Sequence, residues 1–359
     1  MITISLCMIV KNEEDVLERC LSSVRDLVDE IVIADTGSTD RTREIALTFT
    51  DKLYSFQWID DFAAARNFAF SKATKDYCMW LDADDVMEEK DRLELLALKH
   101  TLTSDTDIVM MRYNTAFDEA GKPSFWYYRE RLIRNNREYL WTGAVHEAIT
   151  PSGNIIYSDA AVSHRKIHAG DPDRNLNIYK KMLSEGKKLN AREHYYYARE
   201  LYYHGLYEEA LEVFQRFLTM DEGWLENKIE ACIMTAKCYR ETGAVPAALG
   251  ALLKSLEFDV PRAEVCCEIG NHFMGNGQYE TAVFWFETAL ACRMNFASGG
   301  FIITDCYGYT PALQLCVCCD KLGRHEDAEK YNELAGTFKP TSPAYLYNKA
   351  YFDKIKKNR

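Results

Sequence analysis

The apolar run 77–81 ends in three carboxylates, Asp82, Asp84 and Asp85, and this stretch limits the fold more than any other part of the chain. A short apolar run bounded by polar residues is typical of a strand buried in a parallel sheet. Clustered carboxylates repel one another and raise one another's pKa, so a fold that keeps them together usually binds a cation there. The alternative is a solvated loop in which an aspartate caps the helix that residues 88–100 predict.

A cation bound by this cluster would be a hard divalent ion. Mg²⁺ and Mn²⁺ prefer oxygen ligands, and Mg²⁺ sites usually supply one or two carboxylates and leave the other positions to water and substrate phosphates. The stretch therefore indicates a metal-dependent site that binds a phosphate group.

Residues 1–110 alternate short apolar runs with helical segments. This alternation predicts an α/β domain in which parallel strands are joined by crossover helices. The expected strands are 3–10, 31–35, 52–57, 77–81 and 107–113, and the expected helices are 14–25, 40–50, 62–74 and 88–100. In open sheets of this kind ligands bind at the carboxyl ends of the strands, so the polar residues there should line one edge.

Polar residues follow three of the expected strands. Asn12 and Glu13 follow the first strand, Asp35 ends the second, and the carboxylate cluster follows the fourth. Asp35 precedes the residues that cap the next helix, so its carboxylate is well placed to accept hydrogen bonds from a ribose or a base. Arg66 lies one turn inside a helix and forms either a surface ion pair or, if it faces the strand ends, a contact with a diphosphate that fits its planar fork.

These segments carry a resemblance to a known family. Residues 7–13 (CMIVKNE), 33–40 (IADTGSTD), 65–67 (ARN) and 81–85 (LDADD) resemble, in order, the motifs of family 2 glycosyltransferases of the GT-A fold, a Rossmann-like nucleotide-diphospho-sugar transferase fold. The resemblance covers about residues 1–170. It implies an inverting transfer of a sugar from a nucleotide-activated donor, most often a UDP-sugar.

Carried over by motif, the resemblance implies roles for individual residues. The residues expected at the nucleotide sugar are Val10, Asn12, Glu13, Asp35, Arg66 and Asp82. Asp82 and Asp84 form the D-x-D pair, in which Asp84 would hold Mn²⁺ or Mg²⁺ on the diphosphate. Alternate residues of an extended segment point to the same side, so both carboxylates can face one ligand.

Residues 110–170 should supply the acceptor side, and 141–147 (WTGAVHE) resembles the W-x-G-x-x-H-E segment of this branch of the family. An inverting transfer needs a base that deprotonates the acceptor, and this chain has His146 and Glu147 where many family members have an Asp. We expect Glu147 to be the base, with His146 as the second candidate; the alternative is a salt-bridged Glu beside a core His. GT-A enzymes often recruit a late His to the metal, which makes His164 the candidate for a further metal ligand.

After residue 170 the strand signals stop and a helical period begins. Each of four glycines precedes an alanine by five positions, and the glycines recur at intervals of 34 to 46 residues: Gly205, Gly243, Gly277 and Gly323. A unit of about 34 residues is the tetratricopeptide signature, so about four such repeats are predicted.

The chain is thus expected to contain a GT-A domain at 1–170, tetratricopeptide-like repeats at 171–341 and a capping helix at 342–359. The widest interval carries extra residues near 295–308, which are either a loop covering the groove of the repeats or a partner contact. Repeat solenoids present a concave face that binds extended peptides or helices, and some use it to dimerise. The combination resembles bacterial glycosyltransferases that couple a GT-A domain to such repeats and modify peptides or proteins.

The sequence therefore predicts a metal-dependent inverting glycosyltransferase that moves a sugar from a UDP-sugar to a peptide or protein, with repeats that hold this acceptor or form a homodimer. One alternative is an enzyme of polysaccharide or lipid-linked glycan synthesis. The other is a scaffold with a degenerate transferase domain, against which the intact set of Asp35, Arg66, Asp82 and Asp84 argues.

Composition argues against other kinds of partner. A formal net charge of −12 disfavours nucleic acid or an anionic membrane as the main partner. No run reaches the roughly 18 apolar residues that span a bilayer. The apolar N-terminus lacks a signal peptide's basic residues and is expected to form the first strand. The 12 dispersed cysteines fit a reducing compartment, so we expect a cytoplasmic protein.

Overall fold

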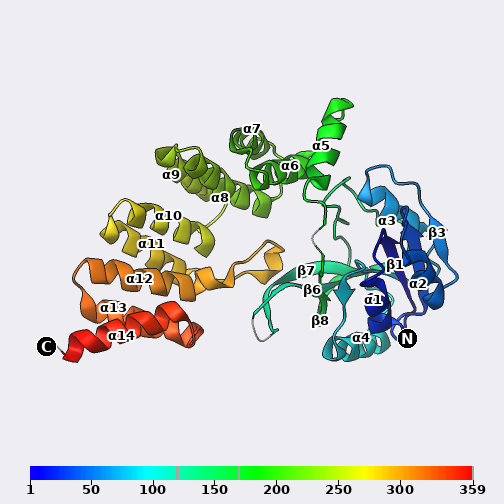
Figure 1. Cartoon of the computed structure of the whole chain (residues 1–359), viewed down its shortest axis with the longest axis horizontal. Helices are drawn as coiled ribbons and strands as arrows, with labels where there is room; N and C mark the ends of the chain where they lie inside the picture. Colours follow the sequence, from blue (N-terminus) through cyan, green and yellow to red (C-terminus); the bar gives the residue numbers. More distant parts are fainter. Residues whose placement is uncertain (119–120, 169, 358–359) are drawn as a thin grey trace. The chain divides into compact units, whose positions relative to one another are not determined.

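The computed structural model describes residues 1–118, 121–168 and 170–357 (Figure 1). The chain forms two compact units, Met1–Lys188 and Leu189–Arg359. The first unit is built on a sheet and the second consists of helices, so the predicted order of an α/β domain followed by helical repeats is confirmed.

The first unit contains a mixed sheet with the strand order β3-β2-β1-β4-β7-β6-β8-β5 among the described residues. Its strands are β1 (Ile4–Val10), β2 (Glu30–Asp35), β3 (Leu53–Ser55), β4 (Tyr77–Trp80), β5 (Asp85–Val86), β6 (Ile108–Phe117), β7 (Pro123–Arg134) and β8 (Ile155–His164). The strands β3, β2, β1 and β4 run parallel, whereas β7 runs antiparallel to β4 and β6. The carboxyl ends of β1, β2 and β4 therefore meet at one edge of the sheet.

Helices cover both faces of this sheet: α1 (Leu17–Val24), α2 (Thr42–Phe49), α3 (Phe62–Ser71) and α4 (Glu89–Thr101), followed by α5 (Arg174–Ser184). Successive residues of β1 show the two faces. Leu6 and Met8 belong to a core with α1, α2 and α4, and Cys7 belongs to a second core with α3. A strand that is apolar on both sides is typical of a sheet covered by helices on each face.

The boundary between the two units differs from the predicted one at residue 170. The first unit extends to Lys188 because α5 packs on it. Lys181 Nζ on α5 lies 2.5 Å from Asp60 Oδ2, and the Arg174 guanidinium lies 4.7 Å from the centre of the Phe62 ring. A helical period alone does not reveal which unit a helix joins, and these contacts decide it.

The second unit consists of helical hairpins followed by a final helix. Its helices are α6 (Ala191–Tyr203), α7 (Tyr207–Leu218), α8 (Leu225–Glu241), α9 (Val245–Lys254), α10 (Ala263–Gly275), α11 (Tyr279–Ala291), α12 (Tyr309–Lys321), α13 (His325–Phe338) and α14 (Pro343–Lys357), with short 3-10 helices η1 (Ser255–Glu257), η2 (Phe296–Ser298) and η3 (Thr304–Tyr307). The four repeat glycines lie in the turns of the hairpins with φ between 73° and 78°, a conformation in which an L side chain is strained. The pattern in the sequence thus marks the turn of each hairpin.

None of the described helices combines the length and the apolar composition that crossing a membrane requires.

Candidate active site

The ends of β1 and β2 are locked together by backbone and side-chain hydrogen bonds. The Thr36 N–H donates to the carbonyl oxygen of Val10, which is buried, at 2.9 Å. Asn12 has a left-handed backbone with φ of 56°; its N–H donates to Ser38 Oγ at 3.0 Å, and its Oδ1 accepts the Thr39 N–H at 2.8 Å. Asn12 therefore holds the loop that follows β2 against the end of β1.

Asp35 at the end of β2 is buried and ionised. Its Oδ1 accepts the Ser38 N–H at 3.1 Å, and its Oδ2 accepts a bond from Arg43 at 2.8 Å. Burial alone would raise the pKa of this carboxyl, but the hydrogen bonds from Ser38 and Arg43 outweigh it and lower the pKa. Sequence reasoning did not identify Arg43, which looks like an ordinary polar residue of α2.

Glu13 follows β1 and lies in the electrostatic field of the carboxylate cluster. Its N–H donates to Thr42 Oγ1 at 2.7 Å. Burial, and then repulsion from Asp84 and Asp82, raises the pKa of the Glu13 carboxyl to about 7. The ends of β1 and β4 are therefore close enough for their carboxylates to repel one another, as the strand order predicts.

Arg66 is the buried cation of the site and joins two carboxylates. One terminal nitrogen of its guanidinium lies 2.7 Å from Asp82 Oδ1, and its Nε lies 2.5 Å from Glu147 Oε1. The guanidinium lies 4.8 Å from the centre of the Trp80 ring and 4.9 Å from that of Trp141. Burial would raise the pKa of Asp82, but the charge of Arg66 outweighs it and lowers this pKa to about 2. Of the two alternatives left open for Arg66, a surface ion pair is excluded because the side chain is buried.

The loop that carries His146 and Glu147 is fixed to α3. The Asn67 side chain donates to the carbonyl oxygen of Trp141 and accepts the Trp141 N–H, both at 2.9 Å. An isolated bridge between Thr142 and Ala148 closes the loop. His146 has a φ of 52°, which is uncommon for a residue other than glycine. These contacts place Glu147 against Arg66, so the salt-bridged geometry foreseen as an alternative for Glu147 is observed.

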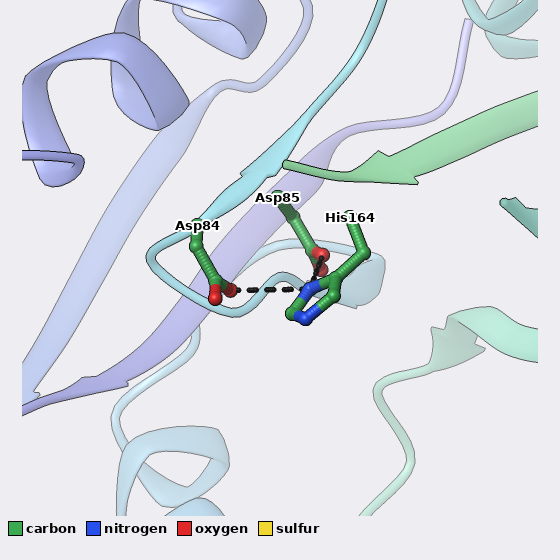
Figure 2. Close-up of side chains that lie close together, drawn as sticks. All are labelled: Asp84, Asp85 and His164. Carbon is green, nitrogen blue, oxygen red and sulfur yellow. Dashed lines mark hydrogen bonds and ion pairs between the residues drawn. The ribbon is translucent and has the colours of Figure 1, made fainter. Parts of the chain in front are cut away.

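Asp84, Asp85 and His164 form a compact group at the same edge (Figure 2). His164 ends β8 and is the register partner of Asp85 on β5. Its Nδ1 lies 3.3 Å from Asp84 Oδ1 and 3.3 Å from Asp85 Oδ1. Hydrogen bonds to Asp84 and then to Asp85 raise the pKa of His164 to about 10. The fold therefore brings together Asp84 and His164, the two residues predicted to share a metal.

Asp85 is a member of this group that the sequence analysis placed in the cation-binding carboxylate cluster without a separate role. It is fully buried; its Oδ2 lies 3.2 Å from Arg131 and accepts the Asp82 N–H at 3.0 Å. Its Oδ1 accepts the Tyr113 hydroxyl at 3.0 Å. The position of Asp85, directly after Asp84, was a usable signal, whereas Arg131 and Tyr113 lie inside long strands and carry none.

The group has the composition of a site for a hard divalent ion. Each of its residues offers one ligand atom, and these oxygen and nitrogen atoms all lie within 4.8 Å of one another. Ligand atoms on one Mg²⁺ ion lie at about 2.0–2.1 Å from it, so a small inward shift would let Asp84 and His164 share one ion. The donor set therefore fits Mg²⁺ or Mn²⁺.

Comparison with known proteins agrees with this geometry. The family model described as glycosyl transferase family 2 matches residues 5–162. A TPR repeat-containing protein of Synechococcus elongatus is 53% identical over 161 residues, which cover 42% of this chain and 36% of that protein. The SPbeta prophage-derived glycosyltransferase SunS of Bacillus subtilis is 26% identical over 227 residues, or 60% of this chain and 53% of SunS.

A third relative is the lipopolysaccharide core biosynthesis glycosyltransferase LpsC of Rhizobium meliloti, which is 30% identical over 168 residues, or 42% of this chain and 58% of LpsC. The chain spans between about a third and three fifths of the length of these relatives. The matched residues contain most of the sheet, the Arg66 bridge, Asp82 and Asp84, and the helical hairpins follow them. Residues 5–162 therefore match glycosyl transferase family 2 in a GT-A-like domain, which precedes a helical region similar to tetratricopeptide repeats.

Proposed function

We propose that the chain is a metal-dependent inverting glycosyltransferase that moves a sugar from a UDP-sugar to a peptide or protein side chain. The observation that carries this proposal is the group of Asp84, Asp85 and His164, whose ligand atoms lie within 4.8 Å of one another beside the Arg66–Asp82 pair. A cation and a cationic fork at one sheet edge suit a ligand with two adjacent phosphates.

The donor would be held by the loops after β1 and β2. Asp35 is kept ionised by Ser38 and Arg43, so it can accept hydrogen bonds from a ribose hydroxyl or a base N–H. Val10, Asn12 and Glu13 are the proposed contacts from the end of β1 and the loop after it, and Asn12 holds the two loops together through Thr39. Asp82 is held by Arg66 and faces the same edge.

The metal ligands in this proposal are Asp84 and His164. Asp85 is held by Arg131, Tyr113 and the Asp82 N–H, so its proposed role is to fix the end of β5, next to Asp84, in place. When bound, the ion would act as a Lewis acid that stabilises charge on the departing diphosphate.

Glu147 is the base in this proposal, and His146 is the other candidate. The bond from Arg66 Nε to Oε1 fixes the orientation of the Glu147 carboxyl group, and a base must be unprotonated to accept a proton from the acceptor. Comparing Glu147→Gln with His146→Gln decides between the two residues. The name of LpsC favours a second candidate function, transfer to a lipid-linked or polysaccharide acceptor.

Calorimetry of the full chain with UDP tests the donor and metal assignments. We expect UDP to bind in the presence of Mn²⁺ and to bind at least tenfold more weakly in EDTA. Asp84→Asn should remove this dependence on Mn²⁺ and abolish UDP-sugar hydrolysis while the circular dichroism spectrum stays the same.

Asp159→Asn is the matched control, because Asp159 lies on the same strand as His164 but its side chain is 72% exposed. It should behave like the unaltered chain. Binding of UDP that is equally tight with Mn²⁺ and with EDTA would contradict the metal assignment.

A further inference from the structure

The longest connection between two helical hairpins is a segment that packs against the hairpins themselves. Residues 295–308, called the insertion segment below, connect α11 to α12 (Figure 1). They contain η2 and η3, with a non-helical stretch between them. The sequence left open whether this segment covers the groove of the repeats or contacts a partner.

The C-terminal half of the insertion segment is anchored on α10. Ile302, Cys306 and Tyr307 are buried in an apolar cluster that includes Cys266 and Cys267 of that helix. One carboxylate of α10, that of Glu264, then binds the segment twice. It accepts the Ile303 N–H at 2.8 Å and the Tyr307 hydroxyl at 3.0 Å. A side chain that binds a backbone N–H recognises an extended chain independently of its sequence.

The N-terminal half reaches the two preceding hairpins. Gly299 has a φ of 75°, and a Cβ on it would lie 3.5 Å from the Trp224 indole. A Cβ on Gly300 would collide with Glu226 Oε2. The backbone can pass close to this carboxylate because residue 300 is a glycine and has no side chain. The Phe301 ring centre then lies 5.6 Å from Arg199 Cζ on α6.

These contacts all fall on one layer of helices. Arg199, Glu226 and Glu264 lie on α6, α8 and α10, the first helices of three successive hairpins. The first helices of neighbouring hairpins contact one another, α6 with α8 and α10 with α12. In helical solenoids such a layer forms the surface that binds extended polypeptide segments. The insertion segment thus occupies this layer in the manner of a peptide ligand.

The N-terminal half leaves apolar surface exposed. Phe301 is large and apolar, yet it is 36% exposed. Its neighbour Arg199 donates to the hydroxyl of Tyr203, an exposed residue of the same helix, at 3.0 Å. Arginine, tyrosine and tryptophan are the residues that dominate binding energy at protein interfaces. A cover that buries so little of its own apolar surface can be displaced.

We propose that the layer formed by Arg199, Trp224 and Glu226 is a docking site for an extended stretch of the acceptor polypeptide. The stretch it fits has glycines followed by an aromatic residue, and residues 295–301 are the internal occupant that it displaces. Only the identification of this polypeptide as the acceptor rests on the proposed function. A tethered occupant competes at an effective concentration in the millimolar range, so weakly matching polypeptides are excluded.

The test uses the full chain, without donor, and a fluorescent peptide with the sequence of residues 295–301. In a linker variant, residues 296–301 are replaced by a Gly-Ser stretch of the same length, so the anchored half stays in place. We expect the linker variant to bind the peptide at least tenfold more tightly than the unaltered chain, and Arg199→Gln in that variant to reverse the gain.

Phe284→Ser in the unaltered chain is the matched control, because Phe284 is likewise an exposed aromatic residue but lies on α11, a second helix of its hairpin. It should not change peptide binding. A linker variant with an unchanged circular dichroism spectrum that binds the peptide no better than the unaltered chain would overturn the proposal. A chain that sediments as a dimer, and as a monomer once the linker is introduced, would assign the layer to a second copy instead. Because no donor is present, neither result bears on the transferase activity.

Discussion

The sheet edge and the helical hairpins are built from contacts of different range. At the sheet edge, Asp85 meets His164 across 79 positions of the chain and Arg66 meets Glu147 across 81. In the helical unit, each hairpin joins two neighbouring helices around a glycine turn. Local contacts repeat in the sequence and can be read from it, whereas contacts of long range depend on the finished sheet. The two units should therefore fail in different ways when single residues are changed.

The largest expected effect is on the buried ion pair under the carboxylate group. Arg131→Met leaves the Asp85 charge buried without its partner, since both side chains are fully buried. Breaking such a pair typically removes about 3–5 kcal/mol of stability. Urea-dependent hydrogen exchange, followed by mass spectrometry, should show the loss in peptides from residues 1–188 and not in those from 189–359.

Two further variants sharpen this first prediction. Arg112→Met removes a pair whose partner, Asp159, is 72% exposed, so it should change stability by about 1 kcal/mol or less. Combining Arg131→Met with Asp85→Asn should recover part of the lost stability, because no buried charge is then left without a partner. If Arg131→Met lowered stability as little as Arg112→Met, the contrast drawn between the sheet unit and the helical unit would lose its main support.

An intermediate effect is expected where two helices of one hairpin cross. A Cβ on Gly270 of α10 would lie 2.6 Å from the Phe286 ring of α11. Overpacking of this kind typically removes about 1–3 kcal/mol, so Gly270→Ala should destabilise the helical unit. Gly250→Ala is the control inside α9, where a Cβ meets nothing within 4 Å, and it should stabilise by about 1 kcal/mol. Equal effects of the two changes on the thermal midpoint would refute the packing explanation.

The smallest effect concerns the pH dependence of the sheet unit. The pKa of Glu13 is about 7 in the folded chain, against 4.5 for an unperturbed glutamate, so the folded state holds a proton that the unfolded state releases. Stability from this group is therefore complete below pH 4.5 and is lost as the pH rises to 7. Glu13→Gln should be no more stable than the unaltered chain at about pH 4. As the pH rises to about 7, the stability of the variant relative to the unaltered chain should increase. Denaturation midpoints at a series of pH values measure this, and a constant difference would contradict the repulsion from Asp84 and Asp82.

The parts that sequence predicts well are those with a local signature. The turn glycines marked each hairpin, and the runs that end in Glu13, Asp35 and Asp82 marked the carboxyl ends of three strands. The pairing of Asp84 with His164 was also predicted, although by resemblance and not by spacing.

The parts that sequence missed depend on partners that only the folded sheet supplies. Arg43, Tyr113 and Arg131 hold Asp35 and Asp85, yet each looks like an ordinary residue of its helix or strand. The domain boundary was missed for the same reason, because the side chains that attach α5 to the first unit contact residues more than 100 positions away. Burial of charge is a property of the assembled fold and has no counterpart in a local pattern.

The guanidinium of Arg66 has a consequence for motion within the proposed site. It is shared between Asp82, on the proposed donor side, and Glu147, on the proposed acceptor side. A planar, rigid cation cannot follow two anions that move apart. Any shift of Asp82 would therefore change the contact between Arg66 and Glu147, so the two sides of the proposed site would be mechanically coupled through one side chain.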